Sequence, residues 1–363
     1  MKRTITRRRA LRSSLAAATV FSTNGLFAQA PKGSPTFELV QEFSEMTVKA
    51  ISPDGAKLCL EEWSRKGYPL RVVEAGTWST LFTENFSSRV LVVQFFADGD
   101  RLLTEFPPTP RTKALLFIAV DLESGARTED SRPYFLPPAP SEAFYSLLGE
   151  KLLLVQGRNH VDRLALLEFP GFEEILSRTF PLRSGSGQYW NIGLSPGRSV
   201  AGLFVNSQVT LVRLDELSIL WSTPLKIGLQ IFKMDISREE HLVAAAIADT
   251  RRSEHETSYI AIYSGDDGEE LARLPVSGIN GIAISPGGGL LAVIVNRPRE
   301  RGAVDVEVEV YGLLDGERIA SLPFAQIPYS QNQFLLLGGT VRFTGDGRYL
   351  VMTAQNTRIW QIG

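Results

Sequence analysis

Short apolar runs separated by turn residues fill the chain from about residue 37 to its end. One turn signature follows such runs repeatedly and is clearest in Ile51-Ser52-Pro53-Asp54-Gly55. Related copies lie at 96–99, 148–152, 194–197, 236–239, 284–287 and 343–347. Successive copies are about 42 to 59 residues apart, a period typical of stacked β-sheet repeats. The pattern therefore predicts an all-β chain whose four-stranded units stand around a ring.

A second set of turn signals lies between these copies, at 121–125, 169–172, 215–217, 265–268 and 314–317. Apolar strands are predicted beside the two sets of turns, at 57–60, 114–120, 209–214, 259–263 and 304–311. Each unit then runs strand, Ser-Pro-Asp-Gly-like turn, strand, longer loop, strand, tight turn, strand. Seven such units predict a seven-bladed β-propeller.

The two ends of the repeat region complement each other. After the last turn, strands are predicted at 349–353 and 357–362, so the final unit lacks its outermost strand. A spare apolar segment, 37–43, precedes the first turn. Pairing it with the final unit would remove two exposed sheet edges. The sequence therefore predicts one propeller domain over residues 31–363, closed by its N-terminal strand.

The first thirty residues differ in composition from the rest. Thr6-Arg7-Arg8-Arg9-Ala10-Leu11-Arg12 resembles a twin-arginine export signal, and a weakly apolar stretch follows at 13–27. Ala28-Gln29-Ala30 fits a small-x-small cleavage pattern. The alternative is an ordinary secretory leader that is rich in arginine. Both interpretations predict a signal peptide at 1–30 and a periplasmic or secreted protein, without a membrane span.

Charge and cysteine content exclude several classes of protein. The net charge of the whole chain is −2, and without the six cations of the first thirty residues it becomes about −8. An acidic body lacks the basic stripe that nucleic-acid binding requires, so no nucleic-acid partner is expected. The chain has 1 cysteine, so it cannot form an internal disulfide. Cys59 is expected to be a small buried residue of a strand.

The recurring Ser-Pro-Asp-Gly turn resembles that of the WD-repeat-like β-propellers, over residues 37–362. The Gly-His pair and the Trp-Asp pair of true WD repeats are missing, and Trp360-Gln361 stands at the end. In repeat style the chain is also similar to exported bacterial propellers that include lactonases and quinoprotein dehydrogenases. The resemblance implies the fold, and none of these families' functional residues can be assigned here.

The loops opposite the two sets of turns are predicted to form the binding surface, because long loops on a rigid scaffold often carry function. They are expected at 104–113, 130–142, 156–162, 182–191, 249–258, 296–303 and 323–338. Arginine with aromatic side chains suits anionic or sugar-like ligands and protein partners. The candidate residues are Tyr134, Phe135, Arg158, His160, Tyr189, Trp190, Arg251, Arg252, Arg297, Arg299, Arg301 and Tyr329. The alternative is a solvated loop surface with no partner.

Catalytic and metal-binding patterns are weak. His160 and His255 are predicted in long loops and His241 beside a tight turn, with no metal-ligand spacing. Ser199 lacks the flanking glycine of a nucleophile elbow and is expected to be structural. Asp235 and Arg342 lie in predicted inner strands, where they could line a central channel. No catalytic residue, metal site or cofactor is predicted.

The sequence thus favours an exported, monomeric propeller that binds a protein or a small anionic or sugar-like ligand through its long-loop face, without catalysis. The alternative is a periplasmic propeller enzyme of the lactonase or quinoprotein dehydrogenase type. Its support is that twin-arginine export carries folded proteins, often with cofactors.

Overall fold

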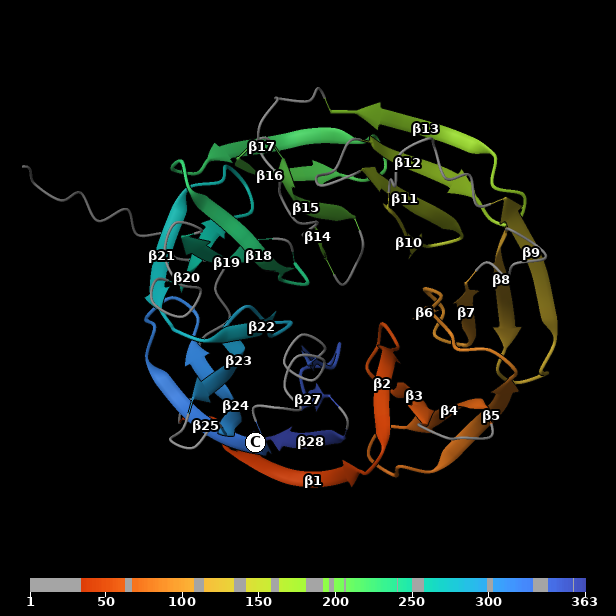
Figure 1. Cartoon of the computed structure of the whole chain (residues 1–363), viewed down its shortest axis with the longest axis horizontal. Helices are drawn as coiled ribbons and strands as arrows, with labels where there is room; N and C mark the ends of the chain where they lie inside the picture. The colour runs from red at the N-terminus through yellow and green to blue at the C-terminus, as the bar shows by residue number, and fades with distance from the viewer. Residues whose placement is uncertain are drawn as a thin grey trace, which may run out of the picture. The chain divides into compact units, whose positions relative to one another are not determined.

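Seven four-stranded antiparallel sheets, blades 1 to 7, form a ring in the computed structural model (Figure 1). The structure describes residues 34–62, 67–107, 114–133, 142–157, 163–180, 192–195, 199–205, 207–239, 241–249, 258–298, 303–328, 339–354 and 356–363. Its fold class is all-β, and in the described residues the regular elements are strands. This confirms the seven-bladed propeller predicted from the turn repeat.

The strands follow chain order from the inside of each blade to its outside. Blade 1 contains β2 (Met46–Ile51), β3 (Lys57–Glu62), β4 (Tyr68–Glu74) and β5 (Thr80–Phe86). Blade 2 contains β6 (Val92–Phe95), β7 (Arg101–Phe106), β8 (Ala114–Asp121) and β9 (Arg127–Pro133). Blade 3 contains β10 (Glu142–Leu148), β11 (Lys151–Gly157), β12 (Arg163–Glu168) and β13 (Glu174–Thr179).

Blades 4 to 6 repeat this order. Blade 4 contains β14 (Ile192–Leu194), β15 (Val200–Val205), β16 (Gln208–Arg213) and β17 (Ser218–Pro224). Blade 5 contains β18 (Leu229–Ile236), β19 (Leu242–Asp249), β20 (Ser258–Ser264) and β21 (Glu270–Pro275). Blade 6 contains β22 (Ile279–Ile284), β23 (Leu290–Pro298), β24 (Ala303–Gly312) and β25 (Arg318–Pro328).

Blade 7 joins the two ends of the repeat region. It contains β26 (Thr340–Phe343), β27 (Tyr349–Thr353) and β28 (Thr357–Ile362), with β1 (Phe37–Phe43) as the outermost strand. β1 pairs with β28 from Phe37 opposite Ile362 to Phe43 opposite Thr357. Beyond the strands, the amide of Gly363 donates to the carbonyl of Thr36 at 3.0 Å. The predicted closure by the N-terminal strand is therefore confirmed.

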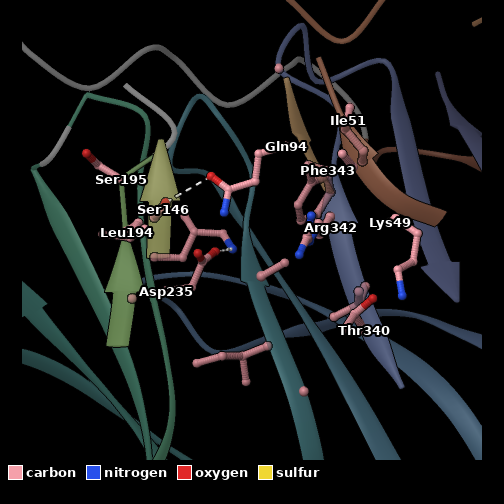
Figure 2. A pocket seen from close by; sticks show the side chains of 18 of the residues that line it. Lys49, Ile51, Gln94, Ser146, Leu194, Ser195, Asp235, Thr340, Arg342 and Phe343 are labelled. Atoms are coloured by element: carbon pink, nitrogen blue, oxygen red, sulfur yellow. Dashed lines mark hydrogen bonds between the residues drawn. The ribbon is translucent and has the colours of Figure 1, made fainter. Parts of the chain in front are cut away.

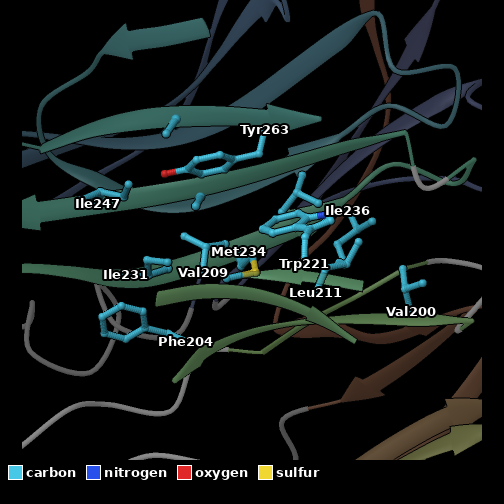
Figure 3. Packing of buried hydrophobic residues seen from close by; sticks show 13 residues of the cluster. Val200, Phe204, Val209, Leu211, Trp221, Ile231, Met234, Ile236, Ile247 and Tyr263 are labelled. Carbon is cyan, nitrogen blue, oxygen red and sulfur yellow. The ribbon is translucent and has the colours of Figure 1, made fainter. Parts of the chain in front are cut away.

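Hydrophobic cores lie between neighbouring blades, because both faces of each sheet are apolar. Figure 3 shows the core between blades 4 and 5, where Trp221, Met234 and Tyr263 pack together. The indole Nε1 of Trp221 donates to the carbonyl of Gly265 at 2.8 Å, which satisfies its polar atom. Cys59 is fully buried in the core between blades 1 and 2, as predicted. Burial raises the pKa of its thiol to about 12, so the residue is inert packing.

The Ser-Pro-Asp-Gly turn works by local hydrogen bonds. The carboxylate Oδ1 of Asp54 accepts from Ser52 Oγ at 2.6 Å and from the amide of Ala56 at 3.0 Å. Burial opposes ionisation of Asp54, but these hydrogen bonds hold its pKa below the ordinary value. Gly55 has a φ of 80°, a conformation that glycine adopts without strain. In blade 7, Asp346 accepts in the same way from Thr344 Oγ1 at 2.6 Å and from the amide of Arg348 at 3.0 Å.

The first turns of blades 1 and 7 touch each other. A Cβ added to Gly345 would overlap the carbonyl oxygen of Pro53, so this position requires glycine although its φ is ordinary. On the other side, the guanidinium Nη1 of Arg238 in blade 5 donates to the carbonyl of Gly345 at 2.6 Å. Gly345 is therefore the point where the turns of three blades are held together.

We expect Gly345→Ala to lower the free energy of unfolding by about 1 to 3 kcal/mol, because the methyl group must displace backbone atoms. Gly287→Ala is the matched control, since nothing lies within 4 Å of the added Cβ there. Urea denaturation of both variants and of the wild type measures the difference. Equal midpoints for Gly345→Ala and Gly287→Ala would contradict the proposed contact.

Candidate functional site: the central channel

The first strands of all seven blades surround a central channel of about 560 Å³. That volume falls in the range of small-molecule sites in proteins. β2, β6, β10, β14, β18, β22 and β26 each contribute at least one lining residue. Figure 2 shows Lys49, Asp235 and Arg342 on different strands around the same space. The sequence-based prediction that Asp235 and Arg342 line a channel is confirmed.

Gln94, Asp235 and Arg342 occupy the same position of their strands. Each lies two residues before the first residue of its turn, which is Phe96, Ser237 or Thr344. The inner strands all run in the same direction along the channel axis. These three residues therefore lie at the same height along that axis, which is referred to as one level of the channel. Lys233 and Thr340, two residues earlier in β18 and β26, lie one level closer to the long-loop face.

Two of these polar residues connect neighbouring blades. Gln94 Oε1 accepts from the amide of Leu147 at 2.7 Å and from Ser146 Oγ at 3.1 Å, and its Nε2 donates to the carbonyl of Tyr145 at 3.2 Å. Asp235 Oδ2 accepts from the amide of Ile284 at 2.6 Å. Blade 2 is thereby joined to blade 3, and blade 5 to blade 6. These contacts have a structural role whatever else the channel does.

The cations of the channel differ in their partners. Lys49 Nζ forms an ion pair with Glu61 Oε2 at 3.1 Å, so its charge is largely balanced. Among the described residues, neither Lys233 nor Arg342 has a carboxylate within the ion-pair distance of 4.0 Å. Asp235 is the acidic group that interacts with Arg342, and it does so over a longer range. The channel therefore carries an excess of positive charge on a protein that is acidic overall.

Enclosure by protein changes how these groups ionise. The Arg342 side chain is open to the channel, and Lys233 and Asp235 are partly so, yet protein walls surround all three. Burial lowers the pKa of Lys233 and of Arg342 from their ordinary values, and the Asp235 charge partly opposes this for Arg342. Burial raises the pKa of Asp235 to about 7 in spite of its hydrogen bonds to Ile284 and Ile236 and the nearby Arg342. A proton on Asp235 near neutral pH makes the channel more positive still.

The predicted binding residues fall mostly outside the described residues. This holds for Tyr134, Phe135, Arg158, His160, Tyr189, Trp190, Arg251, Arg252, Arg299, Arg301 and Tyr329, whose role stays a prediction. Arg297 is described, and the structure corrects its predicted place in a loop. It lies in β23, opposite Asp305, because the β23–β24 ladder extends further than the sequence pattern indicated.

Arg297 belongs to a cluster that sequence reasoning missed. Its guanidinium pairs with Glu309, whose side chain is 1% exposed, and approaches Glu307 at 3.7 Å. Glu309 also accepts from Arg318 Nη1 at 2.9 Å and from the Tyr311 hydroxyl at 2.5 Å. Burial opposes ionisation of Glu309, but these three donors hold its pKa below the ordinary value. Alternating charges along β24 were the available signal, and this cluster cross-links the long strands of blade 6.

Other candidate residues have structural surroundings. His241 lies at the turn between β18 and β19, as predicted, with its Nδ1 3.9 Å from Asp266. The amide of Ser199 donates to Ser195 Oγ at 3.2 Å within a turn. In the part of the chain that the structure describes, no three His, Cys, Asp or Glu side chains gather as a metal site would require. Those same residues include no helix long and apolar enough to cross a membrane.

Comparison with solved structures agrees with this architecture. The chain is similar to the β-propeller domain of Myceliophteria thermophila Cps50 (Swd1), at 12% identity and a TM-score of 0.60, covering 90% of this chain and 100% of that one. It is similar to Kuenenia stuttgartiensis hydrazine synthase, at 14% identity and a TM-score of 0.54, covering 88% and 96%. It is also similar to Kluyvelomyces marxianus Hsv2, at 12% identity and a TM-score of 0.56, covering 87% and 97%.

These similarities agree with the fold of the chain, a seven-bladed β-propeller. Identities this low extend to the fold and not to function. No protein-family model matches the chain, and no curated protein matches it. The enzymatic alternative of a lactonase or quinoprotein dehydrogenase stays a prediction.

We expect the protein to lose stability as pH rises from 5 to 8. Burial raises the pKa of Asp235 and of Glu105 to about 7, so the folded state retains protons that the unfolded chain releases near pH 4. Each carboxyl then contributes about 2 to 3 kcal/mol to this loss. Urea denaturation across this range measures it.

Asp235→Asn and Glu105→Gln should each make the stability profile flatter between pH 5 and 8, because neither amide titrates. Glu239→Gln, on an exposed turn, is the control and should keep the wild-type slope. A wild-type profile that does not fall, or one that both variants leave unchanged, would show that these carboxyls are ionised in the folded protein.

Proposed function

We propose that this protein is an exported, non-catalytic scaffold that holds a partner protein or ligand on its long-loop face. The ring supplies a rigid support, because each blade is buried against two neighbours. The charged groups described above join strands or blades, or line the channel, and these roles suit a binding scaffold.

The difference between the two faces of the ring carries this proposal. On the turn face, the face that carries the Ser-Pro-Asp-Gly-like turns and the tight turns, charged side chains join neighbouring blades. Lys57 Nζ contacts Asp100 Oδ1 at 2.5 Å, Arg101 pairs with Glu150, and Arg178 Nη1 donates to the carbonyl of Leu217 at 2.9 Å. The second strand of each blade ends, and the third begins, on the opposite face of the ring. The sequences that connect these strand ends and successive blades contain the arginine and aromatic residues that suit a partner.

Substitution of the long-loop face should reduce partner binding. We expect Arg251→Ser with Arg252→Ser, in the connection between β19 and β20, to lower partner recovery at least about fivefold, the effect of losing one or two charge-assisted hydrogen bonds. Affinity capture from an envelope extract of the native host, with quantitative mass spectrometry, measures this.

Arg213→Ser with Arg348→Ser on the turn face is the matched control, because it removes the same charge. Partners recovered with the wild type should also be recovered with this control. If the control loses them and the long-loop variant does not, the binding face has been assigned to the wrong side.

The export part of the proposal rests on the arginine-rich leader and the Ala28-Gln29-Ala30 cleavage pattern. We expect Arg7, Arg8 and Arg9→Lys to retain at least about nine tenths of the protein as uncleaved precursor in the cytoplasm, because the twin-arginine route discriminates arginine from lysine. Cell fractionation and intact mass measurement distinguish the precursor from a chain beginning at Pro31. Normal export of the lysine variant would favour the ordinary secretory route, and a cytoplasmic, uncleaved wild type would contradict export.

A further inference from the structure

We propose that the central channel is a binding site for a small oxyanion, a compound that carries a carboxylate or phosphate group, held between Lys233 and Arg342. This inference goes beyond the proposed function and does not depend on the long-loop face. It rests on the geometry and charge of the channel.

The first argument is the arrangement of charge. Lys49 is balanced by Glu61, and within the described residues Lys233 and Arg342 are the channel cations that lack an ion pair within 4.0 Å. A guanidinium without a hydrogen-bonded partner in an enclosed space is costly unless a ligand or water completes its shell. Arg342 presents a planar set of donors, which fits the two oxygens of a carboxylate or phosphate.

The second argument is the space around Arg342. At the same level of the ring, blades 1, 4 and 6 contribute Ala50, Gly193 and Ala283. Ala50 and Ala283 carry short side chains on the two blades beside Arg342, so neither fills the channel there. Gly193 serves packing instead, since an added Cβ would lie 3.0 Å from the backbone carbonyl of Met234.

The third argument concerns direction of entry. Lys233 and Thr340 lie one level closer to the long-loop face than Arg342. At the turn face, the contacts of Gly345 with Pro53 and Arg238 draw three turns together. An anion that enters from the long-loop side therefore meets the ammonium group of Lys233 and the hydroxyl of Thr340 first, and the guanidinium of Arg342 next.

Asp235 makes the site dependent on pH. The other charged residues that line the channel are Lys233 on its own strand, Arg342 on β26 and Lys49 on β2, while β6, β10, β14 and β22 contribute uncharged lining residues. Of these cations, Arg342 is the one whose charge acts on Asp235. A protonated Asp235 leaves the charge of Arg342 free for the ligand, and an ionised one competes with it. Because the pKa of Asp235 is about 7, anion affinity should fall as pH rises through neutrality.

Isothermal titration calorimetry of the full propeller at constant ionic strength tests the site. Sodium sulfate represents a phosphate group and sodium oxalate a carboxylate, and both keep two negative charges from pH 6 to 8.5. We expect one equivalent of at least one probe to bind at pH 6, more weakly at pH 8.5. Binding of sulfate alone assigns a phosphate-type ligand, and binding of oxalate alone assigns a carboxylate.

Variants separate a specific site from general charge. Arg342→Gln and Lys233→Gln should each weaken binding about tenfold or more, the effect of losing one charge-assisted hydrogen bond. Arg213→Gln, which removes a cation from the exposed turn face, should stay within about twofold of wild type. Asp235→Asn should bind equally at both pH values. Thermal unfolding confirms that each variant is folded, and having two channel variants keeps the test decisive if one is not.

Three results would overturn the proposal. One is the absence of heat from either probe at millimolar concentration, and another is equal affinity in Arg342→Gln, Lys233→Gln and Arg213→Gln. The third is an affinity of the wild type that does not change between pH 6 and 8.5 or that falls equally in Asp235→Asn. Loss of the partner in the long-loop variant has no bearing on these outcomes, so the two proposals fail independently.

Discussion

The pairing of β1 with β28 is the constraint on which the rest of the structure depends. Each blade buries both faces, so a ring with an open junction would expose two apolar sheets. At this junction Val48, Leu58 and Leu60 of blade 1 pack against Tyr349, Val351 and Ile359 of blade 7. Two hydrogen bonds fix the position of blade 1 relative to blade 7. The amide of Val48 donates to Thr353 Oγ1 at 3.1 Å, and Thr357 Oγ1 donates to the carbonyl of Met46 at 2.9 Å.

Closure also determines the channel. Because the blades cannot slide past one another once the ring is joined, the inner strands are held at fixed heights. Residues that precede their turns by the same number of positions then lie at the same height in the channel. Gln94 and Arg342 do so although they are far apart in sequence. The turn chemistry sets that distance, since Asp54 and Asp346 fix the start of each turn by the same hydrogen bonds.

Much of this architecture was predictable because its signals are local. A Ser or Thr hydroxyl, an Asp carboxylate and a glycine of positive φ fit within one turn, so the repeat is visible without knowledge of the ring. The lengths of the outer strands were not predictable, because they depend on neighbours. β25 continues to Pro328 through two bulges against β24, and β23 continues to Pro298 on the other side of β24, which places Arg297 within the sheet.

Only some of the charged residues of the channel could be predicted, because the rest depend on local irregularities of the strands. Asp235 and Arg342 interrupt apolar inner strands and could be identified from sequence. Lys49 and Lys233 were missed, because Lys49 sits at a bulge between Val48 and Ala50, and another bulge between Ile231 and Lys233 disturbs the alternation of β18. A bulge shifts which residues share a face, so period-two reasoning fails there.

The charge of Lys233 costs stability that the fold does not need. A hydrophobic residue in place of Lys233, which is partly enclosed, would avoid its desolvation, and buried charges are often replaceable in this way. Within the described residues neither Lys233 nor Arg342 forms an ion pair, in contrast to Lys49 and to the Arg297–Glu309 cluster, where every charge is matched. The same chain thus balances the charges that serve structure, Lys49 included, and leaves Lys233 and Arg342 without an ion pair among the described residues. That contrast is the physical reason to assign these two cations to a ligand and the balanced clusters to the scaffold.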